Sequence, residues 1–261
     1  MDYPRFADLM DEFGYDWEAF KVHTEDHYIL TTFHILGKKG EERVPAKESR
    51  GTVLCQHGDF EDGAYWLSEF TGTPFHLLLV DEGYDIWIGN NRGTEYSWDH
   101  ETLSSKDDDA YWMWTWADMG LYDDIANIKM IKEQTGQDKI FYLGYSQGTI
   151  QMFYGLAHKE SEFVDHIYKA VLLAPCFYCH VEQKAFPVLV ANETIMKFQG
   201  YGVYAINGPN WERDLQTLCD NFPKEVCDYY KGLEGKQGQA VQSEKYWTMN
   251  GTVQRFQEYD D

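Results

Sequence analysis

One serine of this chain stands in a pattern that can make it a nucleophile. Ser146 lies between Gly144 and Gly148 in a G-x-S-x-G motif, after an apolar stretch that predicts a strand and before one that predicts a helix. A strand-to-helix turn this tight leaves no room for side chains at the two flanking positions, so both must be glycine. The turn also holds the serine Oγ exposed. The motif therefore predicts Ser146 as the nucleophile of covalent catalysis.

The same pattern predicts where negative charge would be stabilised. The backbone amide after the serine, on Gln147, points to the place where an oxyanion develops. A second donor should come from the loop after an earlier strand, and the amide of Asp59 fits that place. We interpret Gly58 as a supporting residue of this loop, and His57 as a structural histidine that bonds to loop backbone.

The elements that must position these residues alternate along the chain. Short and nearly all-apolar strands are expected at 52–56, 85–89, 139–143 and 168–174, with helices at 118–135 and 148–158 and a strand pair at 21–27 and 28–36. Such strands are typical of a mostly parallel sheet with helices on both faces, in an α/β fold. Ligands of such sheets bind at the carboxyl ends of the strands.

The alternation ends at Pro175. We predict two parts, an α/β core at 1–175 and a cap or lid at 176–261, because the second stretch is irregular, aromatic and acidic with no clear strand. The cap should lie over the carboxyl edge of the sheet. The aromatic segment 111–116 is either core packing beneath this cap or a wall that contacts lipid.

The composition excludes several classes of function. The chain has 261 residues, with 22 Lys and Arg against 44 Asp and Glu, for a formal net charge of −22. This charge argues against nucleic acid and against a polybasic membrane anchor. No apolar run is long enough for a transmembrane segment, and the first residues lack the apolar stretch of a secretory signal. The localisation stays open.

No cofactor or metal is expected. The C-x-x-C-H pattern at 176–180 matches a haem attachment site, but no second axial ligand can be identified, and two small residues in a packed loop explain it. Four thiols could bind zinc, but the spacing between Cys219 and Cys227 is not a zinc spacing. The acidic run 107–109 reads as a solvated loop rather than a cation site.

Together these motifs resemble the acid lipase family, the gastric and lysosomal acid lipases of the α/β-hydrolase fold. The likeness runs from about Phe6 to Asp260. The matching stretches include 14–15, 22–30, 56–58, 83–93, 112, 119, 122–123, 135–137, 144–149, 173–175, 246–248 and 256–260.

The resemblance implies an α/β-hydrolase-type sheet and hydrolysis of triacylglycerols or sterol esters through an acyl-serine at Ser146. It also implies Gln147 and the residue after Gly58 as oxyanion donors. Family members are secreted or lysosomal. Cys219 and Cys227 resemble two of the three cysteines in the family's cap. Whether these two form a disulfide stays open.

Two positions depart from the family pattern. Asp59 stands where the family has an apolar residue, usually leucine. A carboxylate there would oppose a developing oxyanion unless it turned to solvent. His27 stands where the family usually has glycine, and we expect no consequence.

The catalytic base and acid are not expected among these residues. In this fold they follow the serine in the order acid, then histidine. After Ser146 the chain holds only His158, His166 and His180. The first should end the helix and point away, and the second precedes a strand at the wrong edge. His180 lies on the correct edge, but no acid supports it. The family's acid and histidine lie in its last third, which we expect this chain to lack.

Two functions remain open from the sequence. The first is a lipid ester hydrolase whose acid and histidine come from a missing C-terminal segment or from a second polypeptide that completes the sheet and the triad. The isolated chain would then be inactive, and its sheet would expose an unpaired apolar edge. The second is a catalytically inactive structural or lipid-binding subunit that retains the lipase fold.

Overall fold

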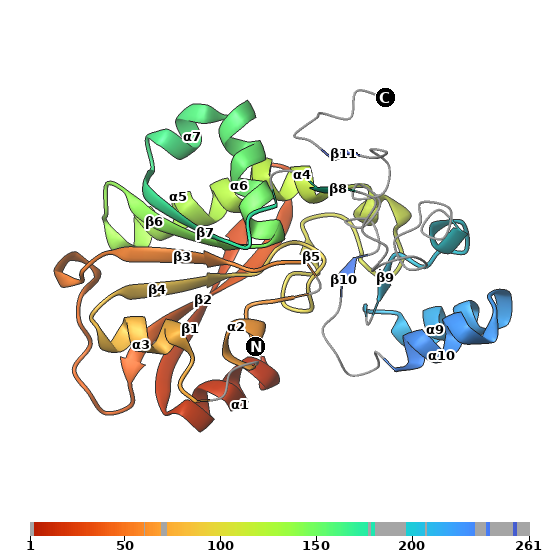
Figure 1. Ribbon diagram of the computed structural model, residues 1–261, viewed down its shortest axis with the longest axis horizontal. Coiled ribbons are helices and arrows are strands. Elements are labelled where there is room, and N and C mark those ends of the chain that lie inside the picture. The colour runs from red at the N-terminus through yellow and green to blue at the C-terminus, as the bar shows by residue number, and fades with distance from the viewer. Residues whose placement is uncertain are drawn as a thin grey trace.

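A single mixed sheet forms the centre of the computed structural model (Figure 1). The structure describes residues 3–59, 61–68, 72–176, 179–180, 197–206, 208–232, 239–240 and 253–254. In this part of the chain the strand order is β1-β2-β4-β3-β6-β7, with β5 paired to β2. The strands are β1 (Tyr15–His23), β2 (Tyr28–Lys38), β3 (Thr52–Gln56), β4 (Asp85–Gly89), β5 (Asp99–His100), β6 (Ile140–Tyr145) and β7 (Ile167–Leu173).

Four of these strands run parallel, as the sequence predicted. β3 pairs with β4 and β6, and β6 pairs with β7, all in parallel, whereas β1 and β2 form an antiparallel hairpin. β3 and β4 have the predicted bounds. β1 begins at Tyr15, earlier than predicted, and β5 lies within the expected loop 90–109. The parallel strands end at one edge of the sheet, where the serine motif lies.

Successive side chains of the central strands point to opposite faces of the sheet, and a layer of helices packs on each face. Val53 and Cys55 pack with α1, α2 and α3, whereas Leu54 between them packs with α5, α6 and α7 on the opposite face. These helices are α1 (Pro4–Phe13), α2 (Tyr65–Ser68), α3 (Phe75–Asp81), α5 (Asp124–Thr135), α6 (Gln147–His158) and α7 (Glu160–Val164). The core therefore has helices on both faces of the sheet (Figure 1).

The helix predicted at 118–135 is not regular. It consists of α4 (Trp116–Asp118), a π-helical turn (Met119–Asp123) and α5. At Gly120 a Cβ atom would lie 2.4 Å from the Gln151 carbonyl oxygen, so this turn touches the backbone of α6 directly. Periodicity alone does not reveal such a contact.

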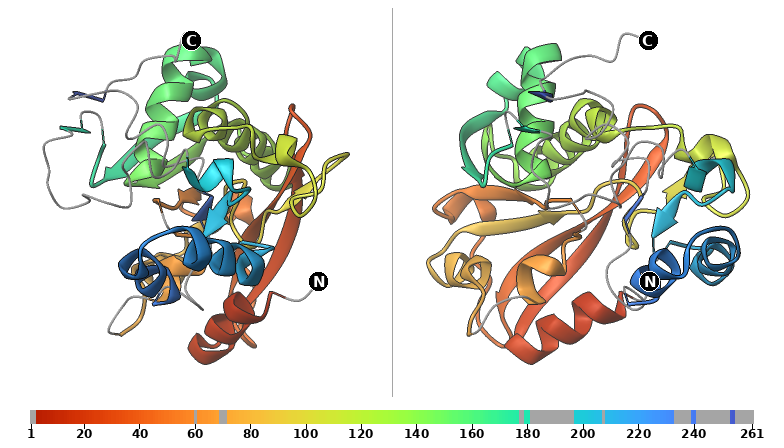
Figure 2. Two further views of the ribbon diagram at one scale, coloured as in Figure 1. Left: turned by 90° about the vertical axis from the view of Figure 1, so that its right-hand side faces the viewer. Right: turned by 45° about the vertical axis from the view of Figure 1, so that its right-hand side comes forward.

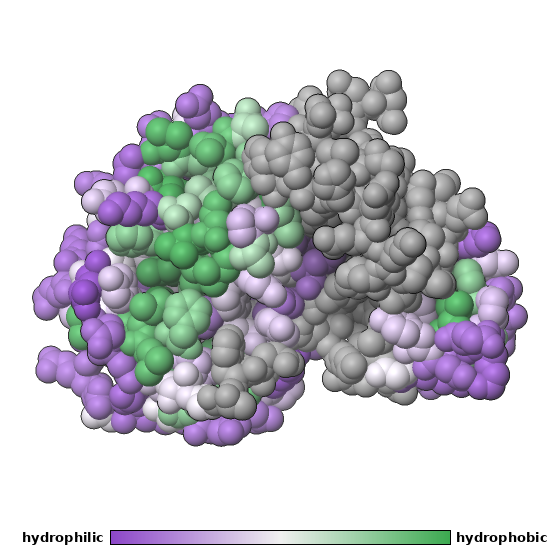
Figure 3. Space-filling model, viewed as in Figure 1, coloured by the Kyte–Doolittle hydropathy of each residue, from purple (hydrophilic) through white to green (hydrophobic). Residues whose placement is uncertain are grey.

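Strand β7 departs from the prediction of a sheet covered on both faces. Side chains along it are open to solvent, with Tyr168 60% and Val171 52% exposed. Figure 3 shows a broad hydrophobic area on this face, over β3, β6 and β7. No strand among the described residues pairs with the free edge of β7. The sheet is therefore open at this end, which agrees with the prediction of an incomplete sheet.

Two helices follow in the region predicted to be an irregular cap. α9 (Trp211–Asn221) and α10 (Lys224–Lys231) lie side by side (Figure 2), and a disulfide joins Cys219 to Cys227. The expectation of no strand here is wrong for two short pairings: β9 (Ala205–Ile206) with β10 (Gln239–Ala240), and β8 (Cys179–His180) with β11 (Val253–Gln254). No helix within the described ranges is long and apolar enough to cross a bilayer.

A buried arginine ties the hairpin to the helical layer. The Arg92 side chain, with no exposed surface, donates from Nη1 and Nη2 to Asp26 at 2.5 and 2.8 Å and from Nε and Nη2 to Asp123 at 2.8 and 2.7 Å. Its guanidinium carbon lies 4.0 Å from the ring centre of Tyr28. Asp26 belongs to the β1–β2 turn and Asp123 to the π turn, so one side chain links three segments.

Replacing this arginine should destabilise the fold. In Arg92→Met the two carboxylates lose their counter-charge, and we expect the free energy of unfolding to fall by about 3–5 kcal/mol. Urea unfolding followed by circular dichroism measures the change. The matched control is Arg50→Met, because Arg50 and Glu82 form an exposed pair; it should cost about 1 kcal/mol or less. Equal losses in the two variants would contradict the assignment.

Candidate active site

Ser146 lies at a sharp turn between β6 and α6. Its backbone has φ 48° and ψ −113°, a conformation that non-glycine residues rarely adopt. The amide of Ser146 donates to the Leu173 carbonyl at 3.0 Å, which ties the turn to the end of β7. Thr149 donates to the Ser146 carbonyl through its amide and its hydroxyl group, at 2.9 and 2.6 Å. These bonds hold the strained turn in place, as nucleophile elbows require.

Both glycines of the motif are required by close backbone contacts. A Cβ atom on Gly148 would lie 2.5 Å from the Gln56 carbonyl oxygen and 2.9 Å from that of His57. A Cβ atom on Gly144 would lie 2.9 Å from the Gly148 carbonyl oxygen. Side chains at both positions would clash, as the motif predicted, and the first turn of α6 rests directly on the end of β3.

The loop after β3 lies against the nucleophile. A Cβ atom on Gly58 would be 3.0 Å from the Cβ atom of Ser146. His57 is buried; its Nε2 accepts from the Asn91 amide at 3.1 Å and its Nδ1 lies 2.8 Å from the Gly58 carbonyl oxygen. Because Nε2 accepts, Nδ1 carries the proton and donates. His57 therefore bonds to loop backbone through both ring nitrogens.

Two carboxylates belong to this loop. Asp59 is half-buried, and its Oδ1 accepts from the Gln147 side-chain amide at 3.2 Å rather than turning wholly to solvent. Glu61, which sequence reasoning missed, is buried, and its Oε2 accepts from the Gly58 amide at 2.8 Å. The expected oxyanion donors, the amides of Gln147 and Asp59, therefore belong to residues whose side chains bond to one another.

A cysteine that the sequence did not assign to the site contacts the serine. Cys176 Sγ lies 3.9 Å from Ser146 Oγ, and the Cys176 amide donates to Thr149 Oγ1 at 3.0 Å. Ala174, two residues earlier, has a positive φ of 47°, so the chain turns sharply after β7. The only sequence signal for this neighbour was its place just after a strand that ends at the same edge.

No described imidazole bonds to the nucleophile. Among the residues that the structure describes, the only hydrogen-bond partner of Ser146 Oγ is Cys176 Sγ. His158 lies at the far end of α6 and bonds to the Tyr154 carbonyl, and His166 precedes β7 beside Lys132, as predicted. The side chain of His180 lies outside the described residues.

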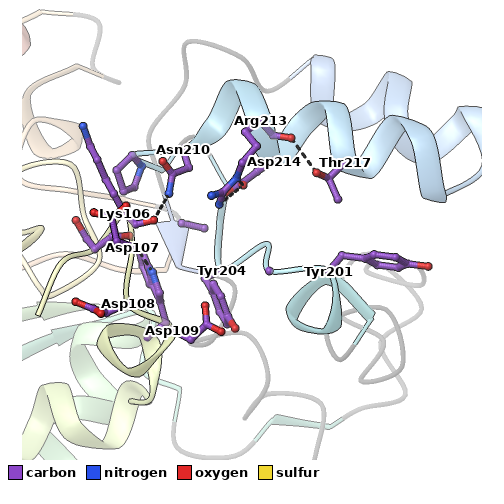
Figure 4. Close-up of a pocket in the computed structure, with 15 residues that line it drawn as sticks. Lys106, Asp107, Asp108, Asp109, Tyr201, Tyr204, Asn210, Arg213, Asp214 and Thr217 are labelled. Atoms are coloured by element: carbon purple, nitrogen blue, oxygen red, sulfur yellow. Dashed lines mark hydrogen bonds and ion pairs between the residues drawn. The ribbon is translucent and has the colours of Figure 1, made fainter.

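Two other stretches that the sequence singled out are described by the structure. Tyr111, Trp112, Trp114 and Trp116 are buried in one apolar cluster, so the segment 111–116 is core packing. The acidic run 107–109 borders a cavity of about 310 Å³ beside α9 (Figure 4). Asp107 and Asp108 bond to Ser104 there. Within the described ranges no group of three or more His, Cys, Asp or Glu residues could hold a metal ion.

Comparison with known proteins agrees with this fold. A family model described as the alpha/beta hydrolase fold matches residues 51–201, and one described as a partial alpha/beta-hydrolase lipase region matches residues 6–70. The chain therefore belongs to the α/β-hydrolase fold family.

Its relatives are lipases. The chain is 32% identical to lipase lipl-5 of Caenorhabditis elegans, with 84% of this chain and 56% of that protein covered. It is 34% identical to human lysosomal acid lipase/cholesteryl ester hydrolase, with 55% and 35% covered. The resemblance to the acid lipases is thus confirmed, and the chain spans about a third to a half of these two relatives. A solved Pyrococcus furiosus esterase, Pf2001, is 18% identical with a TM-score of 0.46, over 85% of this chain and 61% of that one.

Adding a methyl group at the elbow should disrupt it. In Gly148→Ala the new Cβ atom would overlap the Gln56 carbonyl oxygen, and we expect a loss of about 2 kcal/mol or more in the free energy of unfolding. The control is Gly200→Ala, where a Cβ atom would meet nothing within 4 Å; it should change stability by about 0.5 kcal/mol or less. Urea unfolding of both variants tests the contact, and an unaffected Gly148→Ala would contradict it.

Acid should destabilise the loop after β3, which carries the expected oxyanion donor Asp59, through His57. Burial lowers the pKa of His57 from 6.5 to about 4. Because the folded pKa lies below the unfolded one, the unfolded chain binds more protons between these values. The stability that His57 contributes is therefore present above pH 6.5 and lost as the pH falls toward 4. We expect the NMR signals of this imidazole to stay in the neutral form down to about pH 5. A midpoint near pH 6.5 would contradict the burial argument.

Proposed function

We propose that this chain carries the nucleophile of a carboxylic ester hydrolase of the lipase type. Ser146 Oγ attacks the ester carbonyl carbon, the alcohol leaves, and water then cleaves the acyl-serine to release the acid. The single observation that carries the proposal is the strained Ser146 turn packed against Gly58. It supports a position of the hydroxyl group near the loop that carries Asp59, whose amide we expect to stabilise the oxyanion together with that of Gln147.

Lipid esters are the proposed substrates. The supporting observation is the naming of the relatives: human lysosomal acid lipase is also a cholesteryl ester hydrolase, and an Arabidopsis thaliana relative, 32% identical, is triacylglycerol lipase 1. Neither substrate carries a net charge at its reacting ester group. A chain with a net charge of −22 therefore does not repel that group.

We further propose that the catalytic histidine and acid come from polypeptide outside these 261 residues, either a continuation of the chain or a second polypeptide. Two observations support this: no described imidazole bonds to Ser146 Oγ, and the relatives are longer than this chain. Strand β7 offers the place of attachment. An additional parallel strand along its free edge would cover Val171 and would end beside the serine turn.

A second candidate is an inactive subunit that keeps the fold. Asp59 and Glu61 favour it, because two carboxylates on the oxyanion loop oppose negative charge on a substrate oxygen. This candidate predicts that Ser146→Ala changes neither assembly nor any ester turnover.

Labelling with a fluorophosphonate separates the two candidates. In the native protein with its natural partners, the reagent should attach to Ser146 within the tryptic peptide 140–159, and Ser146→Ala should remove the label. Without a base the serine is a weak nucleophile, so the isolated 261-residue chain should react slower, on the order of 10³-fold or more. Mass spectrometry measures both.

Heat-denatured protein is the control for reaction outside a folded site. A well-folded native protein that leaves Ser146 unlabelled, while an unrelated serine esterase in the same tube is labelled, would overturn the hydrolase proposal in favour of the inactive subunit.

A further inference from the structure

Four polar side chains form one line of hydrogen bonds that ends at Asp59, the residue after Gly58, which lies against Ser146. We propose that Asn91 and Gln151 are positioning residues which, through Gln147, hold the Asp59 carboxylate in one place beside the oxyanion hole. This inference rests on the proposed function. It assigns a role to two residues that do not touch the serine.

The line begins on the loop after β4. Asn91 Nδ2 donates to Gln151 Oε1 at 3.3 Å, Gln151 Nε2 donates to Gln147 Oε1 at 3.2 Å, and Gln147 Nε2 donates to Asp59 Oδ1 at 3.2 Å. Gln147 and Gln151 are one turn apart on α6, so their side chains face the same way. Every donor points toward the carboxylate, and hydrogen bonds aligned in this way polarise and strengthen one another.

Burial makes this line stiff. Asn91 and Gln151 have no exposed surface and Gln147 is 1% exposed, so water does not compete for their amide groups. Gln151 Nε2 also contacts Met119 Sδ at 3.1 Å, which fixes its side chain from the π turn. A buried amide that lost its partner would keep the cost of its desolvation, so the line resists rearrangement.

A second set of hydrogen bonds connects Asn91 to the loop after β3. The backbone amide of Asn91 donates to His57 Nε2, and His57 Nδ1 donates to the Gly58 carbonyl, the peptide group that precedes Asp59. Asp59 is therefore held by its side chain through Gln147 and by its backbone through His57. Asn91 takes part in both connections.

Holding the carboxylate in place matters because its charge is unfavourable at this position. A free Asp59 side chain could turn toward the oxygen that becomes negative, and would then oppose the reaction. The bond from the Gln147 amide holds the carboxylate in place and partly offsets its charge. Asn91 and Gln151 act only through this bond, so they are positioning residues and not catalytic ones.

A double-mutant cycle tests this coupling in the full native protein. The variants are Gln151→Met, which keeps the length of the side chain without its polar atoms, Asp59→Asn, which removes the charge, and the double variant. We expect Gln151→Met to lower the maximal rate of fluorophosphonate labelling of Ser146 about tenfold, with the half-saturating reagent concentration unchanged. In the Asp59→Asn background the same change should lower the rate by about twofold or less. An equal loss in both backgrounds, or no loss in the first, would overturn the proposal.

Two further variants support this cycle, one as a control and one as a substitute. Gln216→Met on the exposed face of α9 is the matched control and should leave the labelling rate unchanged, because Gln216 bonds only to Asp220 nearby. If Gln151→Met does not fold, Asn91→Ala cuts the line one bond earlier. It should then show the same dependence on the charge of Asp59.

A measurement without labelling separates this inference from the proposed function. In the native protein, Gln151→Met should shift both the side-chain amide signal of Gln147 and the carboxyl carbon signal of Asp59 in NMR spectra, whereas Gln216→Met should shift neither. If Ser146 is never labelled but both signals move, the hydrolase proposal fails and the positioning role stands. If Ser146 is labelled but the Asp59 signal does not move, the positioning role is overturned.

Discussion

The backbone contact between the first turn of α6 and the end of β3 is the constraint on which the rest of the site depends. No side chain fits between Gly148 and the carbonyl groups of Gln56 and His57. The helix can approach the end of β3 this closely only because Gly148, in its first turn, has no side chain. This approach brings the loop after β3 against Ser146, and without it the two expected oxyanion amides would lie on separate surfaces.

Carboxylates in different parts of the molecule have different hydrogen-bond partners. The half-buried Asp26 and the buried Asp123 share one arginine, which joins the hairpin to the helical layer. At the site, the neutral side-chain amide of Gln147 donates to the Asp59 carboxylate. An amide fixes a carboxylate without cancelling its charge. The loop after β3 therefore carries a negative charge at position 59 that a leucine there would not have.

The sequence predicted those parts of the fold that local patterns determine. β3 and β4 were predicted to the residue because every position in them is apolar or buried, and the serine motif follows from its own spacing. β5, the π turn and α7 were not, because pairing across the sheet or contact with α6 decides them. The contact of Cys176 with Ser146 and that of Gln151 with Gln147 could not be predicted either, since such contacts depend on how whole segments pack.

The open edge of β7 links the state of the sheet to the state of the chemistry. Leu173, the last residue of that strand, accepts the hydrogen bond of the Ser146 amide, so the end of the strand is tied directly to the serine turn. Whatever polypeptide covers β7 also arrives next to Ser146. On the proposed function, the event that completes the sheet would also make the site catalytically competent. A molecule without the added polypeptide would then not hydrolyse the lipids around it.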